Sequence, residues 1–437
     1  MVFSYYNEFI DAKHTDGYEY LFNSLSKKWI KLDCKLAGII RERLDDVPSL
    51  EQIHPELFKA MADEGFIVQN LQEEIAEALT KINDKLASKE HVTITINPTL
   101  DCNLRCWYCY EEHLKGSMMN QSTVNGVVAY IGTLLKSGKV KKLHLAFFGG
   151  EPLLGFRKVV QPVITAVSQI CKENNVGFDL HFTTNAVCMT SGVLEWLMPW
   201  VNTTTFQIAF DGGEENHDST KHFANGLGSY RIVLEHTKEA IRRGFNAVLR
   251  CNYNKDTLTS FIYLIEDLKE FLQADNLRFS FNKIWQAPND RELLDERIRF
   301  IHRIEPYNIN SNLKQYLANS LNPCYGDYRH NMVINYNGDI FKCTARAFKR
   351  ENRLGYIDEN GTVVYDECAI QRTACHYTPY CFACRILPIC PVCSQARAEA
   401  DYGKCPIGID NDGIIRNYQA AFQDLSGIKL NKMEAGR

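Results

Sequence analysis

The sequence contains no run of about 18 consecutive apolar residues, the length that a membrane-spanning helix needs. Its first residues, MVFSYYNEFIDAKH, lack the basic start and apolar core of a signal peptide, so we expect a cytoplasmic protein without a membrane partner. Positive charge is not in excess either, because 49 Lys and Arg stand against 53 Asp and Glu, for a net charge of −4. Proteins whose main partner is nucleic acid are usually basic, so we expect no nucleic-acid partner.

Internal repeats and low-complexity segments are absent, and the composition is that of an ordinary globular protein. Hydrophobic residues make up 45% and charged residues 23% of the 437 positions. A chain of this length usually folds into roughly two to four domains.

Residues 1–89 alternate short strand-like and helical segments. The strand candidates YEYLF and KKWIKL precede helical text in LAGIIRERL and LEQIHPELFKAMADEG, and then come a short strand, FIV, and a longer helix, LQEEIAEALTKINDKLA. The pattern predicts a winged-helix-like module over residues 1–89. A structural cap on the following domain is the alternative.

Six strand-like segments separated by helical text occupy residues 90–320. They are VTITINPT, LHLAFFG, FDLHFTTN, TTFQIAF, NAVLRCNY and LRFSFNKI. Consecutive βα units form a parallel sheet with right-handed crossovers, so we predict an α/β fold with a partial (β/α)6 TIM barrel. Ligands bind at the carboxyl ends of such strands, and motifs directly after strands are therefore the first site candidates.

Residues 321–410 have little periodicity, and the tail at 411–437 contains a predicted helix, IRNYQAAFQDL. Nine of the 16 cysteines lie between Cys324 and Cys405. Without an export signal, such a cluster indicates metal or iron–sulfur ligation rather than disulfides.

Three further cysteines, Cys102, Cys106 and Cys109, follow the first barrel strand with the spacing C-x3-C-x2-C. Three thiols on one loop can hold three irons of a 4Fe–4S cluster and leave the fourth iron open to a small molecule. Structural zinc sites have four ligands, commonly in paired C-x2-C knuckles, which this is not.

This spacing, with Tyr108 in the aromatic position before the last cysteine, resembles the hallmark of the radical S-adenosylmethionine (SAM) superfamily. The resemblance implies a catalytic cluster on Cys102, Cys106 and Cys109 whose open iron chelates SAM. One electron, from a flavodoxin or ferredoxin-type donor, would cleave SAM to methionine and a 5′-deoxyadenosyl radical.

Two motifs after the next strands extend the resemblance. Gly149-Gly150-Glu151-Pro152 resembles the GGEP turn that contacts the SAM amino group, and a carboxylate there suits an ammonium group. Asn185 stands where relatives often read TNG, and it is expected to bond the SAM ribose or carboxylate. Its alternative role is that of a turn residue.

After the fourth strand, Asp211 and Lys221 stand where relatives read S-x-D-G and H-D-x-x-R. Ala209 replaces the Ser and Lys221 replaces the Arg. The resemblance implies that Lys221 pairs with the SAM carboxylate as a point charge. Arg250, which ends the fifth strand with Asn252, is expected to line the same pocket.

The later cysteines resemble the SPASM extension, which carries auxiliary 4Fe–4S clusters in enzymes that modify peptides and proteins. By its interleaved pairing, the resemblance implies an outer cluster on one set and an inner cluster on another, and hence three clusters in all. The outer set is Cys381, Cys384, Cys390 and Cys405, and the inner set is Cys324, Cys343 and Cys393. Structural zinc is the alternative for this region.

The sequence leaves three alternatives for the fourth ligand of the inner cluster. His330 stands at the expected position and is one candidate, Cys368 or Cys375 is another, and an iron that stays open to substrate is the third. The remaining thiols considered, Cys34, Cys171, Cys188 and Cys251, lie in apolar text and are expected to be core residues.

The three regions together resemble maturases of ribosomally made peptides (RiPPs). The N-terminal module would bind the leader of a precursor peptide as an added strand, and the radical would form an intramolecular C–S or C–C cross-link. A sulfatase-maturing formylglycine enzyme is the alternative, although Thr344 stands where such enzymes usually carry Asp. A redox-sensing DNA-binding regulator is the alternative of another class.

Overall fold

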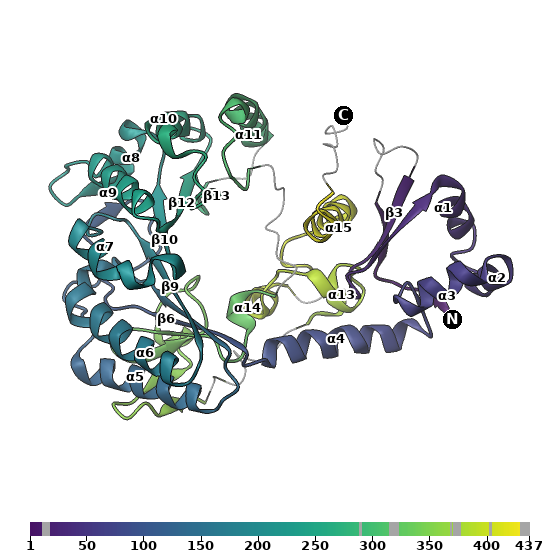
Figure 1. Cartoon of the computed structure of the whole chain (residues 1–437), viewed down its shortest axis with the longest axis horizontal. Helices are drawn as coiled ribbons and strands as arrows, with labels where there is room; N and C mark the ends of the chain where they lie inside the picture. The colour runs from purple at the N-terminus through teal and green to yellow at the C-terminus, as the bar shows by residue number, and fades with distance from the viewer. Residues whose placement is uncertain are drawn as a thin grey trace. The chain divides into compact units, whose positions relative to one another are not determined.

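The computed structural model describes residues 1–10, 18–287, 291–313, 323–367, 369, 377–401 and 404–428. The chain divides into two compact units, each built from segments that are separate in the sequence (Figure 1). The module unit contains residues 1–88, 315–329 and 373–437, and the barrel unit contains residues 89–314 and 330–372.

The barrel unit is built on six parallel strands that pair in chain order. They are β6 (His91–Ile96), β8 (Lys142–Phe147), β9 (Gly177–Thr184), β10 (Thr204–Phe210), β12 (Asn246–Tyr253) and β13 (Leu277–Lys283). Each strand falls on a segment that the sequence predicts, so the α/β partial barrel is confirmed.

Helices follow the strands and cover one face of this sheet (Figure 1). They are α5 (Gln121–Lys136), α6 (Gln161–Glu173), α7 (Ser191–Leu197), α8 (Glu214–Thr220), α9 (Tyr230–Arg242), α10 (Phe261–Asp267) and α11 (Arg291–Ile304). In α5, Val124, Val127, Ile131 and Leu135 recur at the spacing of one helical face and are buried. They pack in one apolar core with the strand residues that point toward the helices.

Residues 330–372 extend the barrel sheet beyond β6, a feature that the sequence pattern does not reveal. β14 (Met332–Ile334) pairs with β6 in parallel. β15 (Asp339–Phe341), β16 (Gly355–Ile357) and β17 (Val363–Tyr365) then follow in antiparallel order. These strands are short, so their alternation is too brief to predict from sequence.

The module unit begins with a three-stranded antiparallel sheet of β2 (Asn7–Ile10), β3 (Tyr18–Asn23) and β4 (Trp29–Asp33). The helices that follow are α1 (Cys34–Arg41), α2 (Val47–Ile53), α3 (Pro55–Asp63) and α4 (Leu71–Ala87). Asp33 caps α1 by accepting from the amides of Lys35 and Leu36. Two strands were not predicted, β2 and the short β1 (Val2–Phe3), which pairs with the predicted β5 (Ile67–Val68).

Both faces of the three-stranded sheet are covered within the module unit. Leu21 of β3 packs in a core with α1, α2 and α3. Its neighbours Tyr20 and Phe22 point the other way and pack with residues of the C-terminal segments. Those segments include α13 (Pro379–Phe382), α14 (Ser394–Glu399) and α15 (Asn411–Ser426). The run Tyr-Leu-Phe is therefore apolar at every position because each face meets a core.

None of the helices in the described ranges is both long and apolar enough to cross a bilayer.

Candidate active site at the carboxyl end of the barrel

The three motif cysteines lie on the loop that leaves β6 and passes through the short strand β7 (Leu104–Cys106). Cys102 is buried, and Cys106 and Cys109 are half-buried. Burial raises the pKa of Cys102 to about 12, and the charges of Glu151, Cys106 and Cys109 add to the rise. Burial also raises the pKa of Cys109, with Cys106 again contributing. The three sulfurs are therefore close enough for the charge of one to raise the pKa of another.

The glycine turn after β8 packs directly against the start of the cysteine loop. A Cβ atom on Gly149 would lie 2.4 Å from the Thr99 carbonyl oxygen, and one on Gly150 would lie 2.2 Å from that of Asp101. The Gly150 amide donates to the Thr99 carbonyl at 3.1 Å. Only glycine permits this approach, and Gly149 also has a positive φ of 103°.

Glu151 holds this turn to the end of β9. Its side chain is fully buried and accepts from the Thr184 hydroxyl at 2.7 Å, from the Asn185 amide at 2.8 Å and from the Leu153 amide at 3.0 Å. Three donors therefore engage the carboxylate that the sequence analysis assigned to an ammonium ligand. The polar groups that this turn still offers to a ligand are therefore those of its backbone.

Tyr108, Asp211 and Lys221 form a buried polar chain beside Cys106. The Tyr108 hydroxyl donates to Asp211 Oδ1 at 2.6 Å. Lys221 Nζ lies 3.4 Å from Asp211 Oδ2 and 3.4 Å from Cys106 Sγ. Burial opposes the charge on Lys221, but the negative charge of Asp211 raises the pKa of Lys221 well above its usual value. The lysine is therefore a fixed positive charge next to a motif sulfur.

Arg250 and Asn252 reach the same chain from the end of β12. Asn252 Nδ2 donates to the Tyr108 hydroxyl at 3.0 Å, and Arg250 Nε donates to Asn252 Oδ1 at 3.0 Å. The structure thus joins residues from the cysteine loop, β10 and β12 into one hydrogen-bonded network.

Asn185 reaches the cysteine loop from the end of β9. Its Nδ2 donates to Asn103 Oδ1 at 2.7 Å and lies 3.7 Å from Cys102 Sγ. Its Oδ1 accepts from the Val187 amide at 3.0 Å, so Asn185 also serves as a turn residue. The sequence analysis missed Asn103, and it missed His113, whose Nε2 lies 3.5 Å from Cys109 Sγ. Their position inside or beside the cysteine loop was the available signal.

The sheet face opposite the helices is polar. In β9, Leu180 and Phe182 are fully buried on the helix side, so Asp179, His181 and Thr183 point to the other face. The strand registers place polar residues from all six strands on that face. They include Thr93, Thr95, His144, His181, Gln207, Arg250, Ser280 and Asn282. A packed barrel interior would be apolar, whereas this face offers hydrogen-bonding groups.

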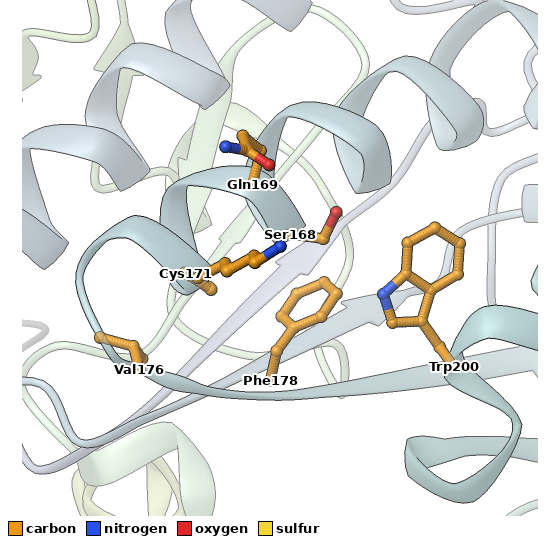
Figure 2. Close-up of a pocket in the computed structure, with 7 residues that line it drawn as sticks. Ser168, Gln169, Cys171, Val176, Phe178 and Trp200 are labelled. Carbon is orange, nitrogen blue, oxygen red and sulfur yellow. The ribbon is translucent and has the colours of Figure 1, made fainter.

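A hollow on the helix-covered side of the barrel is unrelated to these residues. Figure 2 shows that it lies at α6 and the start of β9, and Trp200 closes one side. Its lining is Ser168, Gln169, Cys171, Lys172, Val176, Phe178 and Trp200. Phe178 belongs to the helix-facing side of β9, so the hollow does not open toward the cysteine loop.

The outer cysteine set gathers in the module unit. Burial raises the pKa of Cys384 to about 11, and the charges of Cys390, Cys405 and Cys381 add to the rise. Buried Arg397 hydrogen-bonds Cys390 and also interacts with the charge of Cys381. Four thiols and a guanidinium suit a thiolate-bound cluster, which carries negative charge.

The inner set is divided between the two units. Cys324 and Cys393 belong to the module unit, and a hydrogen bond between them raises the pKa of Cys324. Cys343 and His330 belong to the barrel unit. Cys368 and Cys375 lie outside the described residues. Among the described residues, no three histidine, cysteine or carboxylate side chains converge on a single metal position.

Of the four cysteines expected in the core, two are buried, Cys171 and Cys251. The expectation is wrong for Cys34, which is exposed at the start of α1 because its helix turns that position outward. Cys188 is half-buried, and Asn103 Nδ2 lies 3.7 Å from its sulfur.

Known proteins match this chain in sequence and in fold. The family model described as the radical SAM superfamily matches residues 96–274. Residues 96–274 belong to the radical SAM superfamily. This segment contains the cysteine loop, the glycine turn, Asn185, Asp211 and Lys221, so the family predicted from the cysteine spacing is confirmed.

Individual proteins and solved structures are also similar to this chain. The radical SAM cyclopropyl synthase TigE of Paramaledivibacter caminithermalis is 24% identical over 237 residues, which are 49% of this chain and 47% of TigE. The chain therefore spans about half the length of that relative. The structure of anSMEcpe with bound AdoMet matches with a TM-score of 0.55 at 15% identity, over 77% of this chain and 98% of anSMEcpe. Streptococcus suis SuiB bound to S-adenosylmethionine matches with a TM-score of 0.48 at 16% identity, over 92% of this chain and 97% of SuiB.

Proposed function

We propose that the radical SAM domain binds a 4Fe–4S cluster through Cys102, Cys106 and Cys109 and binds SAM beside it. The observation that carries this proposal is the convergence of the motif residues at the carboxyl end of the barrel. Three thiols lie within range of one another's charge, and the glycine turn, Asn185 and Lys221 border them. When bound to such a cluster and reduced by one electron, SAM supplies a 5′-deoxyadenosyl radical that abstracts a hydrogen atom from substrate.

The surrounding residues divide the binding of SAM among them. Because three donors already engage Glu151, the backbone of Gly149 and Gly150 is the part of the turn that meets the SAM amino group. Lys221 supplies positive charge for the SAM carboxylate and also lies against Cys106. Tyr108 and Asn252, fixed by Asp211 and Arg250, form the polar wall next to it.

Two auxiliary clusters complete the proposed cofactor set. The outer one is held by Cys381, Cys384, Cys390 and Cys405, whose thiols interact with one another's charge. Cys324, Cys343 and Cys393 would hold the inner one. An external flavodoxin or ferredoxin-type protein supplies the electrons.

The substrate in this proposal is a ribosomally made precursor peptide, captured through its leader by the edge of β4. The Asn23 amide donates to the Lys28 carbonyl at 3.0 Å, which closes the β3–β4 hairpin. Hydrogen-bonded pairs alternate along an antiparallel ladder, so the amides of Trp29 and Lys31 point to the outer side of β4. In the described part of the chain, β4 pairs on one side only. An extended leader can add there as a strand.

The modified segment of the peptide would lie along the polar face of the barrel sheet. Side chains such as Gln207 and Asn282 offer both donors and acceptors to a peptide backbone. The product of the proposed reaction is an intramolecular C–S or C–C cross-link. The solved relative anSMEcpe has been studied with a bound Kp18Cys peptide, which makes cysteine-containing peptides the natural first probes.

Anaerobic reconstitution tests the proposal. The wild type should hold about twelve irons and twelve sulfides per chain, four of each per cluster, and should release 5′-deoxyadenosine when reduced with dithionite and SAM. The variant Cys102→Ala/Cys106→Ala/Cys109→Ala should hold about eight irons per chain and should release no 5′-deoxyadenosine. Cys171→Ala, whose buried thiol belongs to α6 and lies away from the site, is the matched control and should behave as wild type. Stoichiometric zinc without sulfide would refute the cluster assignment.

The formylglycine alternative has weaker support from the site. Thr344 follows Cys343, and its carbonyl accepts from the Tyr110 hydroxyl at 2.9 Å. The position next to Cys343 therefore contacts the cysteine loop through a carbonyl oxygen and offers no carboxylate base there.

A further inference from the structure

The peptide group that joins Arg385 to Ile386 follows Cys384, a proposed ligand of the outer cluster. The Ile386 amide hydrogen-bonds the Cys384 sulfur and acts against the rise in the Cys384 pKa that burial causes. In a planar trans peptide, the Ile386 N–H and the Arg385 C=O are one rigid group and point in opposite directions. Whatever fixes the Arg385 carbonyl therefore also aims the amide at the sulfur.

Two hydroxyl groups fix that carbonyl. Tyr418 of α15 donates to the Arg385 carbonyl oxygen at 2.7 Å, and the Ser24 hydroxyl, just after β3, lies 3.4 Å both from that oxygen and from the Tyr418 hydroxyl. Both side chains are fully buried, with an exposed fraction of 0%. Water therefore does not compete for this oxygen, and the two hydroxyls determine how the peptide is oriented.

The N-terminal segment supports the same loop at two further points. The Tyr5 hydroxyl donates to the Ala383 carbonyl at 2.6 Å. Arg385 forms an ion pair with Glu8 of β2 at 2.5 Å. Residues of the first 24 positions thus hold a loop that lies more than 350 residues later in the chain.

We propose that Ser24 and Tyr418 are positioning residues of the outer auxiliary cluster, which hold the 385–386 peptide so that its amide donates to Cys384 and raises the cluster's reduction potential. This rests on the outer cluster of the proposed function. Hydrogen bonds to cluster sulfurs withdraw negative charge and favour the reduced state. The electron that reduces the cluster comes from the external donor, and no bond of the protein changes.

A redox titration followed by electron paramagnetic resonance tests this without peptide or SAM. The background is Cys102→Ala/Cys106→Ala/Cys109→Ala/Cys343→Ala, which leaves the outer cluster alone. In that background, Tyr418→Phe should move the midpoint to a more negative potential, by up to about 59 mV for a tenfold loss of the reduced form. Ser24→Ala should move it in the same direction by less, because its contact is longer.

Ser26→Ala is the matched control. Ser26 lies two residues from Ser24 in the same unit, and its hydroxyl has no hydrogen-bond partner in the described part of the chain. Its removal should leave the midpoint unchanged.

The outcomes separate the inference from the function on which it rests. If the background protein holds no four-iron cluster, the proposed outer cluster is wrong. If the cluster is present and neither Tyr418→Phe nor Ser24→Ala moves its midpoint, the positioning role is wrong. Should Tyr418→Phe lose iron, the midpoint of Ser24→Ala decides, and a value equal to wild type overturns the inference.

Discussion

Lys221 is a buried positive charge that contacts both a buried carboxylate and a cysteine of the proposed catalytic cluster. Its Nζ lies 3.4 Å from Asp211 and 3.4 Å from Cys106, with both side chains of the ion pair almost completely buried. Lys221→Met should lower the free energy of unfolding of the iron-free chain by about 3–5 kcal/mol, because it leaves Asp211 buried without a counter-ion. Lys221→Met/Asp211→Asn should recover most of that loss. Thermal unfolding of the four members of the cycle measures it.

The same cycle distinguishes a structural lysine from one that binds SAM. Equilibrium binding of SAM should stay weak in the double variant, because the positive charge is still missing. Recovery of SAM affinity together with stability would remove Lys221 from the binding site and leave it a purely structural role.

His181 should make the folding stability of the chain depend on pH. Burial lowers the pKa of His181 to about 4, and His144, whose ring centroid lies 5.6 Å away, adds to the effect. Asp179 and Lys142 are the other charged groups beside this pair. The unfolded chain takes up a proton on this histidine near pH 6.5, whereas the folded chain does so only near pH 4. The contribution of neutral His181 to the free energy of unfolding is therefore complete above pH 6.5 and is lost as the pH falls toward 4. The largest possible loss is about 3 kcal/mol.

His181→Gln should therefore flatten the fall in melting temperature between pH 6.5 and pH 4.5. The glutamine keeps a polar side chain but does not titrate. His91→Gln, at an exposed position on β6, is the control and should retain the wild-type slope. Equal slopes in His181→Gln and wild type would contradict the assignment.

At the scale of elements, the barrel was predictable and its extension was not. Six strands of six to eight residues alternate with helices, and their apolar periodicity marks each one. The strands β14 to β17 have three residues each, and no period can be detected over so few positions. The motif residues were found because they follow strands. The engagement of Glu151 by three donors depends on tertiary contacts that no local pattern encodes.

The β4 edge gives a test of peptide capture at the same scale. Lys31→Pro removes an amide that points away from β3, so the ladder within the sheet keeps its hydrogen bonds. It should weaken binding of a leader peptide by about tenfold or more, since one strand-pairing hydrogen bond is lost and its partner is left unpaired. Lys31→Ala, which keeps the amide, should bind like wild type. Fluorescence anisotropy of a labelled leader measures both.

At the scale of the whole molecule, the least predictable feature is which segments of the chain fold together into the module unit. The sequence suggests a separate module at residues 1–89 and a cysteine-rich region at 321–410. The structure instead packs Tyr20 and Phe22 of β3 with Ile386, Tyr418 and Phe422. A second cluster joins Tyr6 and Ala78 with Cys381 and Leu387. Such contacts link residues more than 300 positions apart, and one sequence carries no signal for their pairing.

This packing changes the expected effect of removing the N-terminal residues. Deletion of Met1–Ser88 would expose the apolar side of α15 and remove the supports of the Cys384 loop at Tyr5, Glu8 and Ser24. The deleted chain should therefore lose leader binding and also about four irons, those of the outer cluster. Lys31→Pro should lose leader binding alone and keep about twelve irons. Iron and sulfide analysis beside the anisotropy assay separates the two. A deleted chain that retains full iron content would show that the N-terminal segment is dispensable for the outer cluster, despite the contacts that join them.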